Sequence, residues 1–532
     1  MRRVFIASVV LAFALVAGLS VWWPLALWLL IVVVPLALLG IWDMRQRSHA
    51  ILRTFPIVGH FRYLFEMIRP EINQYFVESN SDGRPFSREQ RSLVYQRAKH
   101  ELSTLPFGTQ RDVGAVGYEW MDHSLSAKSH HGPPPRILIG SPRCQQPYSA
   151  SLLNISAMSY GSLSRNAIRA LNGGAALGGF AHNSGEGGIS PYHIEHGGDL
   201  IWQIGTGYFG CRTVDGAFDA EAFSRQSALP CVKMIEIKLS QGAKPGHGGI
   251  LPAAKVNLEI SNIRGVPIGK DVLSPPGHSE FSTPRGLLRF VDKLRNLSKG
   301  KPIGFKLCVG STHEIAAICK AIRETGISPD FITVDGGEGG TGAAPLEFSN
   351  AVGMPLLDAL SVVHNMLTGF GLRDNVKIIA SGKVVSSFDM IVRLAAGADL
   401  CNSARAMLFS LGCIQALRCN ANDCPTGIAT QRPDLVTGLV VDDKIPRVSR
   451  YHAATLANLM DLLGAAGIDH PSDLRPWHIH RRVSATRVQS YAEIYPRLRP
   501  NCLLEGHDAL LEYVEAFAAA SAESFSRATP DR

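Results

Sequence analysis

From about residue 150 onward, the sequence alternates between short apolar runs and either glycine-rich turns or amphipathic stretches. The runs with the length and composition of strands are 152–158, 178–183, 200–205, 231–239, 302–309, 331–337, 376–382 and 398–404. Helical patterns at 164–178, 311–326 and 387–398 lie between some of them. Strands that alternate with helices form a parallel sheet, so these eight runs predict an α/β fold. Their number favours a closed (β/α)8 TIM barrel over an open doubly wound sheet.

A second constraint lies at the N-terminus, where no charged residue occurs between Val4 and Trp42. One helix of this length would be about 60 Å long, roughly twice the hydrocarbon core of a bilayer. Two crossings, at 4–20 and 22–42, therefore fit better and predict a transmembrane hairpin. Arginines on both flanks, at positions 2, 3, 45, 47 and 53, predict that both ends face the cytoplasm.

The alternative for the N-terminus is a signal peptide that ends near Ala17. The second span would then still leave the main body on the cytoplasmic side. We therefore expect a protein of the inner (cytoplasmic) membrane whose catalytic domain faces the cytoplasm.

Four segments follow from these patterns. We expect a transmembrane hairpin at 1–42, a membrane-proximal helical and connector region at 43–150, a barrel at 151–431, and a C-terminal helical cap and tail at 432–532. The net charge of +8 is spread without a block of lysine and arginine, which argues against a nucleic-acid surface. Most of the ten cysteines are scattered, which favours a reducing compartment over a disulfide framework.

Glycine-rich loops follow the last predicted strands. The loops 381–384 and 402–407 follow the seventh and eighth strands, where such barrels commonly bind a phosphate. The loop 336–345, GGEGGTGAAP, carries little side chain, which suits a backbone close to a planar ligand. Glycine-rich barrel turns without a ligand remain the alternative. The G-x-G-x-x-G matches at 205–210 and 337–342 lack a Rossmann context, so we interpret both as barrel turns.

Cations gather after the fourth predicted strand. The candidates are Lys238, Gln241, Lys244, His247, Lys255 and, further on, Arg264. Such a group suits a dicarboxylate substrate, because lysine and arginine bind carboxylates through charge-assisted hydrogen bonds. A solvated basic loop is the alternative.

Two other charged residues lie at strand positions. Glu186, in a glycine turn after the second strand, is interpreted as an acid–base or substrate-orienting group, or else as an exposed turn residue. Lys306, in the fifth strand, would point into the barrel mouth or interior. Burial there requires an anionic partner such as a reduced flavin.

Three cysteines form the pattern C-x5-C-x4-C, and Pro425 follows the last of them. Any one of them alone would be a small buried hydrophobic residue. A structural zinc site normally takes four protein ligands, whereas clustered cysteines followed by proline are typical of iron–sulfur sites. The pattern therefore predicts an iron–sulfur cluster at Cys413, Cys419 and Cys424. Three thiolates suit a 3Fe–4S cluster, or a 4Fe–4S cluster with a fourth ligand elsewhere.

The stretch from about 150 to 431 resembles the FMN-binding synthase domain of glutamate synthases. The matching blocks are ISAMSYGSLS (155–164), SGEGG (184–188), IKLSQGAKPG (237–246), SPPGH (274–278), GGTGAAP (339–345) and GCIQALRCNANDCPTGIATQ (412–431). The resemblance implies a barrel that holds FMN, and a 3Fe–4S cluster on the three cysteines. It places 2-oxoglutarate at Lys238, Gln241, Lys244 and Arg264, and it matches Glu186 to the family's motif glutamate. The residues that it places along the flavin are Ala157, Met158, Ser159, Lys306, Gly339, Gly340, Thr341, Gly342, Ser381, Gly382, Lys383, Ser403, Ala404 and Arg405.

The sequence also departs from this family. Larger glutamate synthases begin with a glutaminase domain whose nucleophile is an N-terminal cysteine, whereas here two arginines and the predicted anchor follow Met1. We therefore expect no glutamine hydrolysis on this chain. His247 and Ile250 replace the usual Glu and Gln of the substrate loop.

The resemblance implies FMN-dependent reductive amination of 2-oxoglutarate, or a related 2-oxo acid, to L-glutamate. Electrons would come from ferredoxin or an NAD(P)H-oxidising partner, and ammonia would be free or supplied by a separate protein. One alternative is an N-methylglutamate synthase-like enzyme that uses an alkylamine. Another is a membrane-anchored flavin and iron–sulfur electron-transfer module. Oxidation of a 2-hydroxy acid ranks lower because it needs no cluster.

Overall fold

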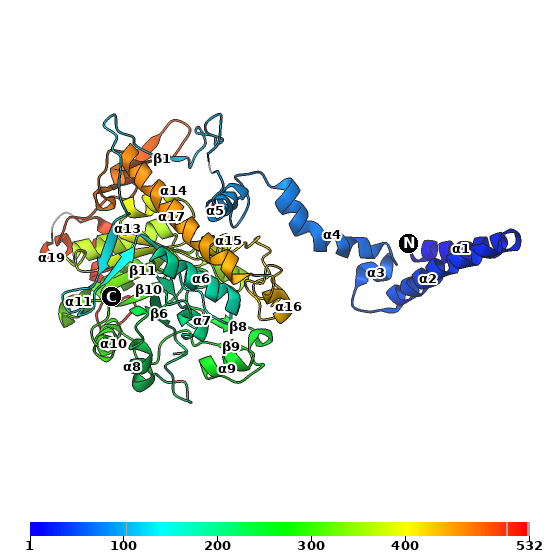
Figure 1. The fold of residues 1–532 in the computed structure, drawn as a ribbon, viewed down its shortest axis with the longest axis horizontal. Coiled ribbons are helices and arrows are strands. Elements are labelled where there is room, and N and C mark those ends of the chain that lie inside the picture. The colour runs from blue at the N-terminus through cyan, green and yellow to red at the C-terminus, as the bar shows by residue number, and fades with distance from the viewer. Residues whose placement is uncertain (103, 507–508, 529–532) are drawn as a thin grey trace. The chain divides into compact units, whose positions relative to one another are not determined.

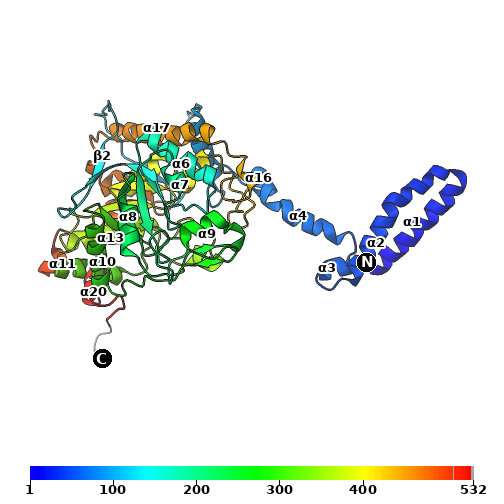
Figure 2. The same ribbon diagram turned by 60° about the horizontal axis from the view of Figure 1, so that its bottom comes forward.

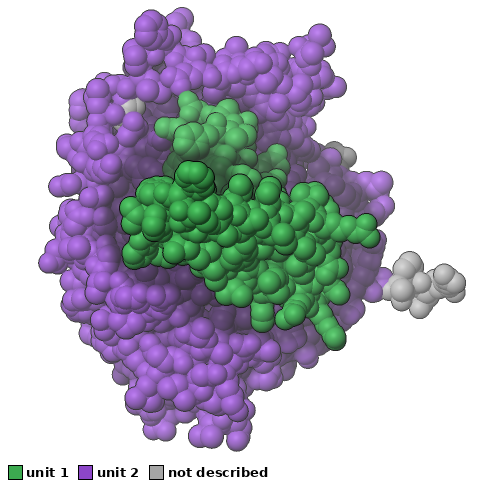
Figure 3. Space-filling view, turned by 90° about the vertical axis from the view of Figure 1, so that its right-hand side faces the viewer, with its two compact units in different colours: residues 1–88 green, residues 89–532 purple. Residues whose placement is uncertain are grey.

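The computed structural model describes residues 1–102, 104–506 and 509–528. The chain forms two compact units, 1–88 and 89–532, which Figure 3 shows in different colours. Each unit is described by itself. The predicted domain boundaries at 42, 150 and 431 stay predictions.

In the described part of the second unit, eight parallel strands close into a barrel (Figure 1). In barrel order these are β4 (Leu153–Ile155), β5 (His182–Asn183), β6 (Leu200–Ile204), β7 (Val232–Lys238), β10 (Ile303–Leu307), β11 (Phe331–Asp335), β12 (Lys377–Ser381) and β13 (Leu400–Ser403). Every residue of β6, β10 and β11 is buried, as expected for a parallel sheet covered on both faces. The predicted (β/α)8 barrel is confirmed, and the open-sheet alternative is wrong.

Helices surround the barrel. The longer ones are α6 (Arg165–Gly178), α8 (Ala220–Ser227), α10 (Pro284–Leu297), α11 (Thr312–Thr325), α13 (Leu356–Gly369), α14 (Ser387–Ala395) and α17 (Val441–Ala465). The shorter ones are α7 (Pro191–Ile194), α9 (Leu258–Arg264), α12 (Leu346–Ala351), α15 (Arg405–Ser410), α16 (Pro433–Val436), α18 (Tyr491–Ile494), α19 (Cys502–Glu505) and α20 (Leu511–Ala518). Local signals set their ends: the Ser164 hydroxyl caps α6 by accepting from Ala167 N, and left-handed Gly179 ends it.

Short strands outside the barrel were missed by the sequence analysis. β1 (Glu119–Met121) pairs with β14 (Ile479–Arg482), which also pairs with β15 (Val488–Ser490). β2 (Arg136–Ile139) pairs with β3 (Tyr148–Ser151), and β8 (Ile250–Leu251) pairs with β9 (Val272–Leu273). The predicted connector region 43–150 therefore contains strands, and so does the predicted helical cap and tail 432–532. Because β1 finds its partner far along the chain, its local sequence carries no pairing signal.

The first unit contains the predicted hairpin. It consists of α1 (Arg2–Trp22), the 3-10 helix η1 (Pro24–Leu29) and α2 (Leu30–Arg45) (Figure 2). The segments Arg2–Trp22 and Pro24–Arg45 are long and apolar enough to cross a membrane, and most of their apolar side chains are exposed. α3 (Ala50–Thr54), α4 (Gly59–Ile72) and the π-helix η2 (Asn73–Val77) follow. The second unit then begins with α5 (Arg88–Lys99).

A buried carboxylate fastens the N-terminal end of the barrel. Asp330, fully buried just before β11, accepts hydrogen bonds from the backbone N–H of Ser141 (2.6 Å) and Ile303 (2.7 Å). It also accepts one from Arg295 Nη2 of α10 (3.1 Å). These bonds join the segment after β2, the start of β10, and α10 to one side chain, and they offset the cost of burying its charge.

Replacing Asp330 should therefore destabilise the barrel. We expect Asp330→Asn to lower the free energy of unfolding by about 3 kcal/mol, because it leaves the buried Arg295 with only the more distant and partly exposed Asp292 as a carboxylate partner. The matched control is Asp292→Asn, which removes a half-exposed partner of the same arginine and should cost less than about 1 kcal/mol. Urea unfolding followed by circular dichroism measures both. Equal effects of the two substitutions would contradict this role for Asp330.

Candidate active site

The interior of the barrel holds a buried anion, Glu236 on β7. Its Oε1 accepts hydrogen bonds from Asn183 Nδ2 of β5 (2.8 Å) and from Gln203 Nε2 of β6 (2.7 Å). Its Oε2 accepts one from Thr333 Oγ1 of β11 (2.6 Å). Glu236 is fully buried, so these donors replace the water that would otherwise solvate the carboxylate.

Lys306 on β10 is the cation of this interior. Its Nζ lies 3.3 Å from Asp335 Oδ2, at the end of β11. Burial opposes protonation of Lys306, but Asp335 and Glu236 outweigh it and raise the lysine pKa. The sequence predicts an anionic partner for the buried Lys306, and Asp335 of the same chain is that partner. Asp335 Oδ2 also accepts from Gly242 N (3.1 Å), which fixes the loop that follows β7.

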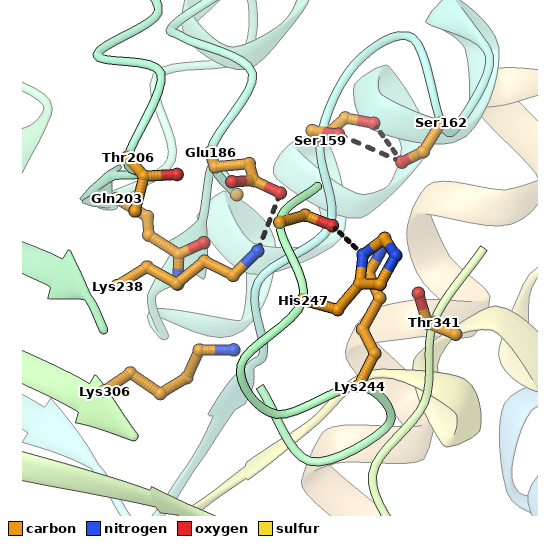
Figure 4. Close-up of polar contacts among 12 residues, drawn as sticks. Ser159, Ser162, Glu186, Gln203, Thr206, Lys238, Lys244, His247, Lys306 and Thr341 are labelled. Carbon is orange, nitrogen blue, oxygen red and sulfur yellow. Dashed lines mark hydrogen bonds and ion pairs between the residues drawn. The ribbon is translucent and has the colours of Figure 1, made fainter. Parts of the chain in front are cut away.

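An ion pair lies at the C-terminal mouth of the barrel. Lys238, the last residue of β7, is the register partner of Lys306, so both side chains point inward from adjacent strands (Figure 4). Lys238 Nζ donates to Glu186 Oε1 at 2.7 Å. Burial alone would raise the pKa of Glu186, but Lys238, Arg264 and Lys244 outweigh it and lower the pKa. Burial also lowers the pKa of Lys238, and Glu186 opposes this shift.

A small, partly open cavity lies beside this ion pair. The residues that line it are Glu186, Thr206, Lys238, Leu239, Ser240, Gly246, His247, Gly248, Gly249, Pro275 and Pro276. A Cβ added at Gly249 would lie 2.4 Å from Glu186 Oε1, and one at Gly205 would lie 2.6 Å from Glu186 Oε2. Glycine at these positions therefore lets two loops close directly on the carboxylate.

The other predicted substrate cations lie around this centre. Lys244 Nζ donates to the Ala343 carbonyl (2.9 Å), and burial, aided by Lys238, lowers the lysine pKa to about 8. Arg264 Nη2 donates to the Tyr160 carbonyl (2.9 Å), and burial lowers its pKa to about 10. Arg264 is thus directed at the loop after β4. Gln241 lies half-buried on the loop of Lys244. The substrate roles of these residues stay predictions.

The residues predicted to line a flavin lie at the C-terminal ends of four strands. Ala157, Met158 and Ser159 follow β4, and Gly339, Gly340, Thr341 and Gly342 follow β11. Ser381 and Ser403 end β12 and β13, with Gly382, Lys383, Ala404 and Arg405 directly after them. The Oγ atoms of Ser156 and Ser381, 3.2 Å apart, join the ends of β4 and β12.

This rim has the properties of a flavin cradle. No described side chain caps the N-terminus of α15, which follows the eighth barrel strand, where such barrels commonly bind a phosphate. The buried Asn402 Oδ1 has no partner among the described residues. Arg405 Nη2 donates to the Glu338 carbonyl (2.7 Å), and burial lowers the pKa of Arg405 to about 10. Small side chains and an orphaned polar atom fit a bound flavin.

The three predicted cluster ligands lie in an irregular loop between α15 and α16. Gln415, Leu417 and Asn422 adopt left-handed backbone angles, with φ of 58°, 56° and 61°. Asn422 holds the loop: its Oδ1 accepts from Gln431 N (2.7 Å) and its Nδ2 donates to the Ala254 carbonyl (2.9 Å). Tyr95 of α5 donates to the loop's first residue, at the Cys413 carbonyl (2.5 Å).

The thiols differ in their surroundings. Burial raises the pKa of Cys413 to about 12, aided by the charges of Cys419 and Cys424 and opposed by the backbone hydrogen bond from Gln415. Burial also opposes ionisation of Cys424, but hydrogen bonds from the Thr426 hydroxyl and from nearby backbone N–H groups outweigh it and lower its pKa. Among the described residues, no three His, Cys, Asp or Glu side chains are gathered around a single-ion position. A cluster spreads its ligands over several irons, so this arrangement does not test the cluster.

Lys255 takes a position that the sequence analysis missed. Its buried Nζ donates to three backbone carbonyls, of Ser162 (3.0 Å), Cys419 (2.7 Å) and Ala429 (2.8 Å). Burial lowers the pKa of Lys255 to about 8, while Cys419 and Cys424 oppose this shift. The sequence analysis grouped Lys255 with the substrate cations. The structure instead places it between the loop after β4 and the cysteine loop.

Other residues of the site were also missed. Glu236 and Asp335 are acidic residues within otherwise apolar strand sequences, CVKMIEIKL and FITVDGG. An acidic side chain in a buried strand is costly unless it is paired, so this pattern could have identified both. His278 carried no such signal: its Nε2 lies 3.0 Å from the Lys238 carbonyl, and burial lowers its pKa to about 4.

Comparison with known proteins gives a consistent set of relatives. The family model described as "Conserved region in glutamate synthase" matches residues 139–469. A glutamate synthase large subunit-like protein, YerD of Bacillus subtilis, is 38% identical over 84% of this chain and 93% of its own. An archaeal glutamate synthase [NADPH] of Methanocaldococcus jannaschii is 37% identical over 60% of each chain. The chain thus spans about three-fifths of the length of the archaeal relative.

Solved structures show more distant similarity. A mandelate oxidase has a TM-score of 0.40 and 12% identity, over 81% of this chain and 96% of its own. A flavocytochrome b2 has a TM-score of 0.43 and 12% identity, over 88% of this chain and 95% of its own. Scores of this size carry no conclusion about the site.

Lys255 can be tested against a matched lysine. We expect Lys255→Met to lower the free energy of unfolding by about 3 kcal/mol, because three buried carbonyls lose their donor. Lys301→Met is the control, since Lys301 Nζ also donates to three carbonyls, of Ser227, Leu229 and Val232, far from the cysteines in sequence. Both variants should be destabilised, but only Lys255→Met should speed alkylation of Cys413 and Cys419 in the metal-free protein. Equal alkylation rates in the two variants would refute a role for Lys255 in holding the cysteine loop.

Proposed function

Because the chain belongs to the glutamate synthase family and is a glutamate synthase-like oxidoreductase, we propose that it reductively aminates 2-oxoglutarate, or a related 2-oxo acid, to L-glutamate. The observation that carries this proposal is the ion pair of Lys238 and Glu186 at the mouth of a closed barrel, with Lys244 and Arg264 close enough for their charges to lower the pKa of Glu186. An excess of cations beside a cavity suits a substrate with two carboxylates.

Residues in and beside the cavity would have separate roles. Lys244 and Gln241, on the loop after β7, would hold the carboxylate that lies farther from the oxo group. Glu186, kept ionised by the surrounding cations, would accept a proton from the attacking ammonia at Oε1, while Lys238 Nζ polarises the carbonyl and protonates the oxo oxygen to give the carbinolamine. Glu186 would then return its proton to Lys238 through their hydrogen bond. Lys238 would pass this proton to the departing hydroxyl, so that water leaves and the protonated imine forms.

FMN is the cofactor that fits this rim. Residues 381–383 and 403–405 would hold its phosphate, and residues 157–159 and 339–342 would lie along its ring. When bound, FMN would supply a hydride to the imine carbon. Lys306, whose pKa is raised by Asp335 and Glu236 against the effect of burial, remains protonated and contributes positive charge to the barrel mouth.

The cysteine loop would hold the second cofactor. We propose that Cys413, Cys419 and Cys424 bind a 3Fe–4S cluster, supported by a loop that Asn422, Tyr95 and Lys255 hold in place. The cluster would accept electrons one at a time from ferredoxin or an NAD(P)H-oxidising protein. Ammonia would be free or come from a separate protein. The apolar helices at 2–22 and 24–45 would anchor the enzyme in the cytoplasmic membrane, with the barrel in the cytoplasm.

One assay tests the reaction. The purified protein is reduced anaerobically, and its flavin spectrum is followed with 2-oxoglutarate plus ammonia and then with 2-oxoglutarate plus methylamine. We expect rapid reoxidation with ammonia. Faster reoxidation with methylamine would favour an N-methylglutamate synthase-like enzyme. No response to either pair would refute the synthase function and leave an electron-transfer module.

The same assay tests the role of Lys238. We expect Lys238→Met to slow reoxidation by roughly 10²–10⁴-fold, because the proton donor to the oxo oxygen is lost. Lys233→Met is the matched control, since Lys233 lies on the same strand and pairs with Asp199 at the half-exposed surface. The control should retain the original rate. A similar rate in Lys238→Met would exclude this lysine from the chemistry.

The cluster has a separate test. We expect Cys419→Ser to abolish the EPR signal of the cluster and lower the iron content, while flavin still binds. Cys231→Ser is the control, because Cys231 is a half-buried thiol far from the cysteine loop in sequence. A full EPR signal in Cys419→Ser would show that the cluster has other ligands.

A further inference from the structure

The first unit presents an apolar stripe that the proposed reaction does not use. Along α4, the residues Phe61, Leu64, Phe65, Ile68 and Ile72 follow the spacing of one helical face. Four of them are exposed within this unit: Phe61 by 55%, Leu64 by 44%, Phe65 by 61% and Ile72 by 42%. A stripe of this kind normally packs against another apolar surface.

The apolar character continues beyond α4, and a charged row runs beside the stripe. Phe76 and Val77 in η2 are 84% and 69% exposed. Arg62, Glu66 and Arg69 form this row at helical spacing and are exposed. Tyr63 and Met67, which are 38% and 59% exposed, lie on the remaining side. The helix is therefore amphipathic, with an apolar stripe and a charged row, as is typical of helices that lie in a membrane interface.

Contacts within the first unit attach the start of α4 to the end of the hairpin (Figure 2). Asp43, in the last turn of α2, is 1% exposed. Its Oδ2 accepts from Ile57 N (2.9 Å), and its Oδ1 lies 3.0 Å from His60 Nε2 in the first turn of α4. A charged residue of this kind marks the end of the apolar span. α4 therefore begins at the level where a spanning hairpin would leave the hydrocarbon core.

The chain between the hairpin and α4 has the charge that suits a phospholipid surface. Residues 44–58 contain Arg45, Arg47 and Arg53 and no acidic residue. Cationic residues next to a membrane span are attracted to anionic phospholipid headgroups. The apolar stripe, its attachment to the hairpin and this charge all favour one occupant, which is the lipid surface.

We propose that α4 and η2 lie along the cytoplasmic surface of the membrane that the hairpin spans, with Phe61, Leu64, Phe65, Ile72 and Phe76 inserted at the boundary between headgroups and acyl chains. This inference rests on the proposed anchor and is independent of the reaction. It makes the region after the hairpin an interfacial lipid-binding element.

Site-specific photocrosslinking of the full chain in vesicles of phosphatidylglycerol and phosphatidylethanolamine tests this surface. The photoreactive residue p-benzoylphenylalanine replaces Phe61 or Phe65 on the apolar face, or Glu66 on the charged face as the matched control. A fourth site, Leu36 in the hairpin, tests the anchor itself. After irradiation, mass spectrometry identifies the cross-linked partner at each site.

We expect lipid adducts at positions 36, 61 and 65 and no lipid adduct at position 66. Adducts at 36, combined with protein cross-links at 61 and 65, would overturn the proposal, because another protein surface would then cover the stripe. Equal lipid adducts at 61, 65 and 66 would also overturn it, because the whole helix would then be immersed in lipid. Absence of an adduct at 36 would refute the anchor, and the inference with it.

Discussion

The buried carboxylate of Glu236 is the constraint on which the barrel mouth depends. A charge at zero exposure is tolerable only with full hydrogen bonding, and donors from β5, β6 and β11 provide it. Its negative charge helps to keep Lys306 protonated, and Lys306 pairs with Asp335. Asp335 in turn accepts from Gly242 N and so fixes the loop after β7. A line of alternating charges thus runs from the barrel interior to the loop that carries Lys244.

The strands of the barrel could be predicted because burial on both faces leaves a signal in the local sequence. β10, with every residue buried, is a continuous apolar run apart from Lys306. β1 gave no such signal, because it is only three residues long and its partner β14 is more than 350 residues away. What stabilises them is the pairing itself, together with Glu119 bonded to Arg481 and Tyr491. Pairing over such a distance cannot be read from a window of sequence.

Some residues of the site could likewise be predicted from local sequence, and others could not. Lys238 and Glu186 could be predicted because each lies at a strand end or in the turn after it, where barrel sites form. The contacts of the segment 250–264 could not be predicted from the sequence, because tertiary packing determines which groups its cationic side chains reach. From the sequence, both Arg264 and Lys255 are predicted to be cations that bind the substrate. In the structure, Arg264 binds the Tyr160 carbonyl and Lys255 binds carbonyls of the cysteine loop.

Arg264 and Lys255 connect separate parts of the site, because both lie on the segment 250–264 and both bind the loop after β4. Arg264 holds the Tyr160 carbonyl, and Lys255 holds the Ser162 carbonyl together with that of Cys419. Hydrogen bonds to backbone carbonyls therefore join the loop after β4, the segment 250–264 and the cysteine loop. A displacement of the cysteine loop would be transmitted to the loop after β4 through the ammonium group of Lys255. Loss of the proposed cluster would therefore also loosen the proposed flavin side of the site.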